Sequence, residues 1–415
     1  MPRAFGVFAA VSLIGATCAS APAIVVSDNP SASWHLVPPP SAYDGVGMLT
    51  SGGTCSAVLI NPWFILTANH TLSNYQSKQF ALDLVGGRQS FGMIEKFEHP
   101  NVDLAVVRLK RSTEMDGYGL YRTGNPYGEL GQNLYILGYG MSGTPATVGA
   151  GGDPAYPRGT KRIGQNKVNV VGDVYGDGKE YLQYDFDPPS STGDYWGSLG
   201  TDKEVMIGMG DSGGPSFLMS GGELLVAGIH VSLTDIDGDN KYPEYGDFGN
   251  DLRVNAYADW IESKIPDQPA TETGDFNYDD LTNHLDINAL FAHIGGSDMW
   301  YDLTGDVAIS PADVDDLIHA KIATEYGDAN LDFQVGLADY NILASHFGQA
   351  GTFEWEDGDF TGDGKVNFAD YQILEAAFGF GGAPGAPPGV PVPEPATLAL
   401  LGLGVLALLR RRRDG

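Results

Sequence analysis

The sequence predicts a large, mainly β-stranded region, then small α-helical repeats and a C-terminal, transmembrane-like tail. Short apolar runs bounded by turn residues recur up to residue 265, as in compact all-β proteins. Four acidic segments of one shared spacing follow, and each leads into an apolar stretch of helical period. A last apolar run, 396–409, precedes four arginines. At 415 residues the chain exceeds one hydrophobic core, so several domains are expected.

The composition excludes one broad class of function. The formal net charge is −30, and a phosphate backbone would be repelled by such a surface, so nucleic acid is not expected as a partner. The 57 glycines and 25 prolines fit loop-rich β structure joined by linkers.

Residues 1–23 predict a secretory signal peptide. Arg3 gives a weakly positive start, an apolar core covers 4–16, and Ala-Pro-Ala at 21–23 suits cleavage after Ala23. A short buried helix is the alternative. Cleavage would export the protein to the cell surface, the extracellular matrix or the medium, with Ile24 as its first residue.

The stretch Gly-Met-Gly-Asp-Ser-Gly-Gly-Pro, residues 208–215, points to nucleophilic chemistry. A serine hydroxyl attacks only when a base removes its proton and donors stabilise the oxyanion. His70 follows an apolar run and Asp103 opens another, so a base and a carboxylate precede Ser212 in the chain. Taken singly, these residues are more simply a turn serine, a core histidine and a cap.

Four blocks, 67–70, 103–109, 210–215 and 253–261, together resemble the chymotrypsin/trypsin-like serine proteases over roughly residues 45–265. The resemblance implies an all-β double barrel (chymotrypsin-like) over residues 24–265, closed by a helix near 251–264. The strand candidates are 56–60, 64–68, 104–109, 133–138, 167–171, 181–186 and 224–232.

The resemblance also implies a role for each motif residue. Ser212 would be the nucleophile, His70 the general base and then acid, and Asp103 the group that fixes the imidazole tautomer. The N–H groups of Gly210 and Ser212 would form the oxyanion hole. The expected function is a secreted serine endopeptidase that hydrolyses peptide bonds through an acyl-enzyme and needs no cofactor for catalysis.

Several positions depart from the family pattern. Met206, six residues before the nucleophile, replaces the acid of a trypsin-like specificity pocket, so an apolar or small side chain is expected before the scissile bond. Thr71 stands where relatives carry a disulfide cysteine. The family's new N-terminus pairs with the acid before the nucleophile, here Asp211, and we expect Ile24 to do so without a separate activation step.

After a linker at 266–274, residues 275–380 hold 21 acidic residues against two lysines, a net charge of −19. Calcium takes six to eight oxygen ligands, which a twelve-residue loop supplies at alternate positions. Four segments have that spacing. Positions 1, 3, 5, 9 and 12 are Asp275, Asn277, Asp279, Asn283 and Asp286; Asp302, Thr304, Asp306, Ser310 and Asp313; Asp328, Asn330, Asp332, Gly336 and Asp339; and Asp359, Thr361, Asp363, Asn367 and Asp370, with Lys365 as a further candidate in the fourth loop.

These segments resemble dockerin-type calcium repeats, a variant of the EF-hand, arranged as two pairs. The resemblance implies structural Ca²⁺ and a cohesin-like or matrix partner. Each twelfth residue is expected to open an apolar helix. Only the fourth loop has glycine at position 6, Gly364. An acidic disordered tail is the alternative, but the recurrent apolar faces favour folded repeats.

The C-terminal end combines a Gly/Pro-rich spacer, 381–392, with a Pro-Glu-Pro motif, an apolar run and arginines in 393–415. This segment resembles the PEP-CTERM sorting signal, which implies processing by an exosortase-type enzyme. The apolar run would span roughly 21 Å as a helix, short of the ~30 Å hydrocarbon core. A permanent tail anchor is the alternative.

Two other functions remain open at this point. The protein could be a calcium-dependent surface adhesion or scaffold protein whose protease fold is inert. It could also be an esterase that uses the same three residues.

Overall fold

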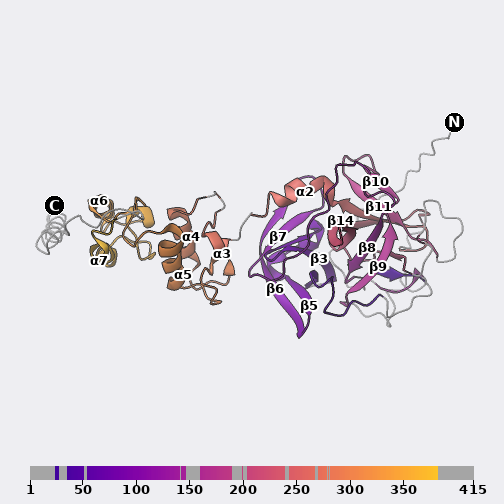
Figure 1. Ribbon diagram of the computed structural model, residues 1–415, viewed down its shortest axis with the longest axis horizontal. Coiled ribbons are helices and arrows are strands. Elements are labelled where there is room, and N and C mark those ends of the chain that lie inside the picture. Colours follow the sequence, from indigo (N-terminus) through magenta and orange to yellow (C-terminus); the bar gives the residue numbers. More distant parts are fainter. Residues whose placement is uncertain are drawn as a thin grey trace, which may run out of the picture. The chain divides into compact units, whose positions relative to one another are not determined.

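The structure, a computed structural model, describes residues 24–27, 35–50, 54–140, 142–145, 159–188, 199, 203–238, 243–266, 270–277, 279 and 281–381. The chain divides into two compact units, Met1–Ile265 and Pro266–Gly415. The first is built from strands and the second from short helices (Figure 1). The predicted signal peptide and sorting tail lie outside the described residues.

The first half of the N-terminal unit is a closed antiparallel barrel. Its strand order is β2 (Val46–Thr50), β3 (Thr54–Asn61), β4 (Phe64–Thr67), β7 (Ala105–Leu109), β6 (Gly87–Glu98) and β5 (Gln79–Leu84). Strand β7 is buried throughout, which explains a continuous apolar run where a half-exposed strand would alternate. Leu49, Phe80 and Val107 belong to the core that fills this barrel.

The second half is a seven-stranded antiparallel sheet with its own core. Its order is β10 (Val170–Gly172), β11 (Tyr181–Asp185), β15 (Phe248–Arg253), β14 (Glu223–Thr234), β13 (Pro215–Ser220), β8 (Asn133–Gly138) and β9 (Arg162–Lys167). Leu134, Tyr184 and Leu218 lie in that core. The double-barrel architecture predicted for this unit is confirmed.

Two elements close this unit. Strand β1 (Val25–Val26) pairs with β12 (Val205–Met206), which carries the first described residues into the second core. Helix α2 (Val254–Glu262) confirms the predicted closing helix and buries Val254, Ala258 and Ile261. Its entry is anchored by Arg253, whose guanidinium donates to both oxygens of buried Glu129.

Most predicted strands are confirmed, since six of the candidate ranges fall on β3, β4, β7, β8, β11 and β14. The strand predicted at 167–171 is wrong. Strand β9 ends at Lys167 and β10 begins at Val170, and the main-chain N–H groups of Val168 and Asn169 donate to Gln132 and Gln183 across the turn. Val168 is buried although it lies in a connection.

The C-terminal unit contains α3 (Ala270–Thr273), α4 (His284–His293), η3 (Met299–Tyr301), α5 (Pro311–Asp316), the π-helical η4 (Leu317–Ile322), α6 (Leu337–His346), η5 (Trp355–Asp357) and α7 (Phe368–Ala377). Each predicted loop leads into a helix, so the interpretation as a disordered tail does not hold for the described residues. The helices begin at loop position 10, two residues earlier than predicted.

Trp355 joins the two halves of this unit. Its indole N–H donates to the Asp328 carbonyl of the third loop, and its main-chain N–H donates to Asn288 on α4. The ring contacts Phe291 of α4 and Phe360 of the fourth loop. Trp355 therefore links the first, third and fourth loop–helix repeats.

No helix among the described residues is long and apolar enough to cross a membrane. The predicted transmembrane-like tail lies beyond residue 381, outside those residues.

Candidate active site

His70 is held by Asp103 through two hydrogen bonds. The His70 main-chain N–H donates to Asp103 Oδ1 at 2.8 Å, and ring Nδ1 lies 2.5 Å from Asp103 Oδ2. His70 sits on the short 3₁₀ helix η1 (Asn69–Leu72), directly after β4. Burial alone would raise the pKa of Asp103, but the hydrogen bonds and charge of His70 hold it below its usual range.

The nucleophile loop packs against the strand that carries the histidine. Gly213 has φ +81, and a Cβ added there would lie 1.9 Å from Thr67 Oγ1. The main-chain N–H of Ser56 donates to the Ser212 carbonyl at 2.9 Å. The fold therefore brings Ser212 beside the histidine loop, although 142 positions separate the two residues in the sequence. Their side chains, the Ser212 hydroxyl and the His70 ring, share no hydrogen bond in the structure.

Thr71 helps fix the histidine loop at the position where relatives would have a disulfide. Its hydroxyl donates to the Ala68 carbonyl at 2.7 Å and lies 3.2 Å from the Thr67 hydroxyl. Buried Lys78 donates to the Thr71 carbonyl at 2.5 Å. Buried hydroxyl contacts thus constrain the loop between β4 and Leu72.

The loop leaves two main-chain donors free for an oxyanion. Within the described part of the chain, neither Gly210 N–H nor Ser212 N–H donates a hydrogen bond. The intervening Asp211 N–H is used, because it donates to the Gly208 carbonyl. Gly140 must be glycine for this packing, since a Cβ there would lie 2.2 Å from the Asp211 nitrogen.

Asp211 is fully buried and accepts three main-chain hydrogen bonds. Its Oδ2 accepts from Ile24 at 2.9 Å and from Gly208 at 2.8 Å, and its Oδ1 accepts from Gly140 at 2.9 Å. Burial raises the pKa of Asp211 to about 6, although these bonds and the charge of His230 oppose the shift. The nitrogen expected to meet Asp211, that of Ile24, lies against it.

Ser56 is a positioning residue that the sequence analysis missed. Besides its bond to Ser212, its carbonyl accepts from Thr67 Oγ1 and its hydroxyl accepts from the Tyr139 N–H at 3.0 Å. One buried residue of β3 thus links the histidine strand, the nucleophile loop and the end of β8. An isolated serine in an apolar run gives no sequence signal for this role.

Met206 is fully buried within the second core. A Cβ on Gly249 would lie 2.4 Å from the Tyr184 ring and 2.9 Å from Met206 Sδ. The backbone of Gly249 is therefore in close contact with the Met206 thioether and the Tyr184 ring, neither of which carries a carboxylate.

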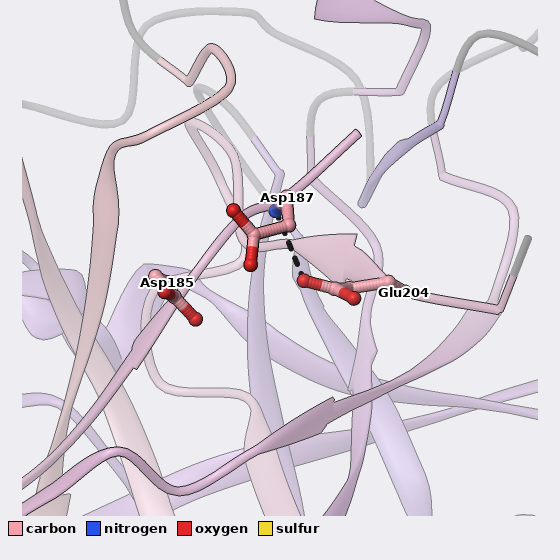
Figure 2. Close-up of side chains that lie close together, drawn as sticks. All are labelled: Asp185, Asp187 and Glu204. Carbon is pink, nitrogen blue, oxygen red and sulfur yellow. Dashed lines mark hydrogen bonds between the residues drawn. The ribbon is translucent and has the colours of Figure 1, made fainter. Parts of the chain in front are cut away.

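Three buried carboxylates form a second cluster that the sequence analysis missed. Asp185, Asp187 and Glu204 each place an oxygen within 4.8 Å of the others. Figure 2 shows them converging, with Asp187 N–H donating to Glu204 Oε1 at 2.9 Å. Carboxylate oxygens of this kind could hold a hard cation. The residues come from β11, the loop after it and the start of β12, so no local motif reveals them.

The four acidic loops of the C-terminal unit share one backbone arrangement. The first carboxylate accepts N–H groups of its own loop; Asp302, for example, accepts from Gly305 and Val307, each at 2.8 Å. The twelfth carboxylate accepts from the ninth residue, as Asp313 does from Ser310 at 2.8 Å. Asp275, Asp328 and Asp359 occupy the first position in the other loops, and Asp286, Asp339 and Asp370 occupy the twelfth.

Helix capping explains two of the five ligand positions without any ion. The ninth residues Asn283, Ser310, Gly336 and Asn367 are N-caps, and in each loop the twelfth aspartate accepts the main-chain N–H of the N-cap. The side chains of Asn283, Ser310 and Asn367 complete capping boxes, which Gly336 cannot do because it has no side chain. Capping does not explain the polar residues at positions 1, 3 and 5. In the second loop, Thr304 Oγ1 lies within hydrogen-bond distance of both Asp302 and Asp313, which joins positions 1, 3 and 12. No three carboxylates of any loop lie within 4.8 Å of one another among the described residues.

Position 6 adopts positive φ wherever the structure describes it. Val307 has φ +67, Phe333 φ +66 and Gly364 φ +79. The turn suits glycine, and a β-branched or aromatic residue is strained there. The second and third loops therefore form the same turn as the fourth at a conformational cost.

Comparisons with known proteins assign the N-terminal unit and the C-terminal end to known sequence families. The family model described as Trypsin matches residues 40–261, more than half of the chain, and the PEP-CTERM protein-sorting motif matches residues 391–413. No curated protein matches. Among solved structures, neuropsin, a serine protease expressed in the limbic system of mouse brain, is similar at 18% identity; the match covers 56% of this chain and 98% of that chain, with a TM-score of 0.39. Through its N-terminal unit, the chain belongs to the trypsin family.

Proposed function

We propose that this protein is an exported serine endopeptidase in which Ser212 attacks the peptide carbonyl. His70 takes the hydroxyl proton and returns it to the leaving amine, and Asp103 holds the ring in the tautomer with a free Nε2. The observation that carries the proposal is the double hydrogen bond of Asp103 to His70, beside the loop of Ser212. Trypsin-family membership supports a protease.

The oxyanion of the tetrahedral intermediate would rest on the N–H groups of Gly210 and Ser212. Both donors are unused within the described residues, so binding the oxyanion breaks no existing hydrogen bond. Preorganised donors of this kind are worth roughly 10²–10³ in kcat each.

We propose further that removal of the signal peptide after Ala23 creates the active N-terminus. The Ile24 nitrogen lies 2.9 Å from Asp211 Oδ2 and the Ile24 side chain is fully buried. A free ammonium at that nitrogen would offset the buried carboxylate better than an amide does. N-terminal sequencing of the active secreted protein tests this, and an active enzyme that starts well downstream of Ile24 would contradict it.

The proposed specificity is for an apolar or small side chain before the scissile bond. Met206, at the position expected to set the specificity, packs with Tyr184 against the backbone of Gly249, and neither side chain offers a charge to lysine or arginine. Profiling cleavage over a peptide library tests this assignment. A clear preference for lysine or arginine would overturn it.

Covalent labelling separates the endopeptidase from its two rivals. A fluorophosphonate probe should tag the wild-type protein and fail to tag Ser212→Ala, whereas an inert scaffold would leave both unlabelled. Hydrolysis of peptides together with labelling supports the endopeptidase. Labelling combined with turnover of esters alone would instead identify an esterase.

A second proposal concerns the repeats, which we assign to structural Ca²⁺ binding. The polar residues at positions 1, 3 and 5, which capping leaves unexplained, favour it, and a cation would offset the mutual repulsion of the carboxylates. In calorimetry of the full chain, chelating calcium should lower the unfolding temperature of residues 270–381 and leave the unfolding temperature of the N-terminal unit unchanged. The variant Asp359→Asn should weaken the calcium response, with Glu375→Gln, an exposed carboxylate on α7 outside the loops, as its control. A melting curve indifferent to calcium would refute the proposal.

The proposed location is outside the cell. The sorting motif at 391–413 implies export and C-terminal processing by an exosortase-type enzyme. Mass spectrometry of the mature C-terminus tests this, and a product that still carries Arg410–413 would count against processing.

A further inference from the structure

A second histidine–aspartate pair lies beneath the nucleophile loop, and the proposed mechanism does not use it. His230 on β14 and Asp251 on β15 are both fully buried, with His230 Nδ1 2.7 Å from Asp251 Oδ1. Gly228 makes room for the carboxylate, because a Cβ there would lie 2.8 Å from Asp251 Oδ2. Buried ionisable groups destabilise the folded state unless they are paired, so a role for this buried pair is expected.

The contacts of His230 fit a doubly protonated ring. Ring Nε2 lies 3.2 Å from the Leu137 carbonyl, so both ring nitrogens face oxygen acceptors. Asp251 Oδ1 also accepts from the Tyr184 hydroxyl at 3.1 Å, as a carboxylate does. A neutral imidazole has only one N–H and would leave one of these contacts without a proton. Burial alone would lower the pKa of His230, but Asp251, Asp211 and the Leu137 carbonyl raise it overall.

The pair is in direct contact with the residues that follow Ser212. Gly213 N–H donates to the His230 carbonyl at 2.8 Å, and His230 N–H donates to the Gly214 carbonyl at 2.9 Å. A Cβ on Gly214 would lie 2.9 Å from both His230 Cδ2 and the Asp211 carbonyl oxygen. The imidazole thus packs against the backbone that presents the nucleophile.

Three buried ionisable side chains lie around the loop, Asp211, His230 and Asp251. In their ionised forms they carry two negative charges and one positive charge, none of them exposed. The groups that act on His230 are Asp251 from β15, Asp211 from the nucleophile loop and the Leu137 carbonyl from β8, and Tyr184 from β11 donates to Asp251. Without the imidazolium, the positive group left beside these two carboxylates would be the Ile24 ammonium proposed above, which contacts Asp211.

We propose that His230 is a positioning residue whose buried imidazolium keeps Asp211 ionised and so holds the Ser212 loop in its active shape. The carboxylate form of Asp211 accepts from Ile24, Gly208 and Gly140 far more strongly than the protonated form, because hydrogen bonds to an ionised acceptor are roughly twice as strong. Loss of those bonds would release the turn that aims Gly210 N–H and Ser212 N–H. This inference rests on the proposed protease function and concerns how its nucleophile loop is controlled.

The pH profile of kcat/KM tests the charge of His230 rather than its volume. In His230→Gln the acid limb should move upward by roughly one pH unit, since an opposite charge nearby shifts a carboxyl pKa by one to three units. At the pH values where His230→Gln loses activity, kcat should fall while KM changes little. His99→Gln is the matched control, because His99 packs against Tyr257 and Trp260 away from the loop, and it should keep the wild-type profile.

The double variant His230→Gln/Asp251→Asn provides a rescue. It removes one charge of each sign, so the cluster regains its original net charge and the acid limb should return toward the wild-type position. If the His230 ring only fills space, the two substitutions should lower activity additively and the acid limb of the pH profile should not move. Either an unmoved limb in His230→Gln or no recovery in the double variant would overturn the inference.

A readout independent of activity separates this inference from the proposed function. Nitrogen-15 NMR of the catalytically dead Ser212→Ala protein at neutral pH should show a histidine protonated at both ring nitrogens, and Ser212→Ala/His230→Gln should lack that signal. A neutral His230 would refute the inference even if the wild-type enzyme is active. Absence of fluorophosphonate labelling would refute the proposed function and leave the NMR result to judge the charge cluster.

Discussion

Asp103→Asn is the sharpest test of the proposed mechanism, because it changes one atom and removes one charge. The amide can still accept from the His70 main-chain N–H. Its other group, NH₂, would face His70 Nδ1, which the carboxylate contacts at 2.5 Å in the structure. The ring would then turn its Nδ1 lone pair to the amide and carry its proton on Nε2, the nitrogen that must receive the Ser212 proton.

The size of the effect follows from two contributions. A hydrogen bond to a charged group is worth about 1.5–3 kcal/mol, and the imidazolium formed during attack loses an opposite charge worth about 4 kcal/mol at an effective dielectric of 20. These contributions overlap, so we expect the variant to lose about 5 kcal/mol of transition-state stabilisation. That corresponds to a fall in kcat of roughly 10⁴-fold.

The assay is the rate of peptide hydrolysis, supported by the rate of fluorophosphonate labelling. The control is Glu98→Gln, which removes a carboxylate that binds Asn69 next to the histidine but does not contact the His70 ring; it should stay near wild type. Circular dichroism confirms that both variants are folded. Turnover of folded Asp103→Asn within tenfold of wild type would refute the reasoning.

Three further predictions follow from packing, backbone strain and burial. Gly213→Ala should lose about 2–5 kcal/mol of stability in urea denaturation, since positive φ costs about 1–2 kcal/mol and the Cβ clash adds about 1–3 kcal/mol. The control is Gly221→Ala, where φ is +63 but the space around the Cβ is open, so only the cost of positive φ should appear. Equal losses in the two variants would contradict the clash. Val307→Gly should raise the melting temperature of the repeats by relieving about 1 kcal/mol of backbone strain at positive φ. Val307→Ala keeps a Cβ and should leave the melting temperature unchanged. A higher melting temperature in Val307→Ala alone would argue against backbone strain. Burial raises the pKa of Asp247 to about 6, so ionisation of this carboxyl destabilises the fold progressively between about pH 4, its unfolded value, and about pH 6. Asp247→Asn should therefore stabilise the protein by about 1–3 kcal/mol at pH 7.5, by about half as much at pH 5 and hardly at all at about pH 3.5; an equal gain at the two extremes would contradict the assignment.

The sequence revealed the parts of the site that lie in short motifs. Ser212, His70 and Asp103 each sit in a recognisable block, so their meeting could be expected before the fold was known. Ser56, His230 and the carboxylate cluster could not, because each is a single polar residue whose partners come from distant strands. Their roles depend on strand register, which no local pattern specifies.

The strands show the same division. Strands β8 and β14 were predicted because their apolar residues run together. Strand β6 was missed, since it is a long half-exposed strand with charged and polar residues on its outer face. In the repeats, the spacing predicted loops and helices correctly, but the start of each helix is set by the ninth residue, whose side chain or backbone caps it.

Trp355 has a practical consequence for dissecting the C-terminal unit. Because Trp355 is bonded to α4 through its main-chain N–H and to the third loop through its indole N–H, heating should melt residues 270–381 in a single cooperative step. A shortened chain that stops after the second loop would leave Phe291 facing water and invite aggregation. Fragments intended for binding studies should therefore keep all four repeats, and the fluorescence of this indole would report whether the halves have stayed together.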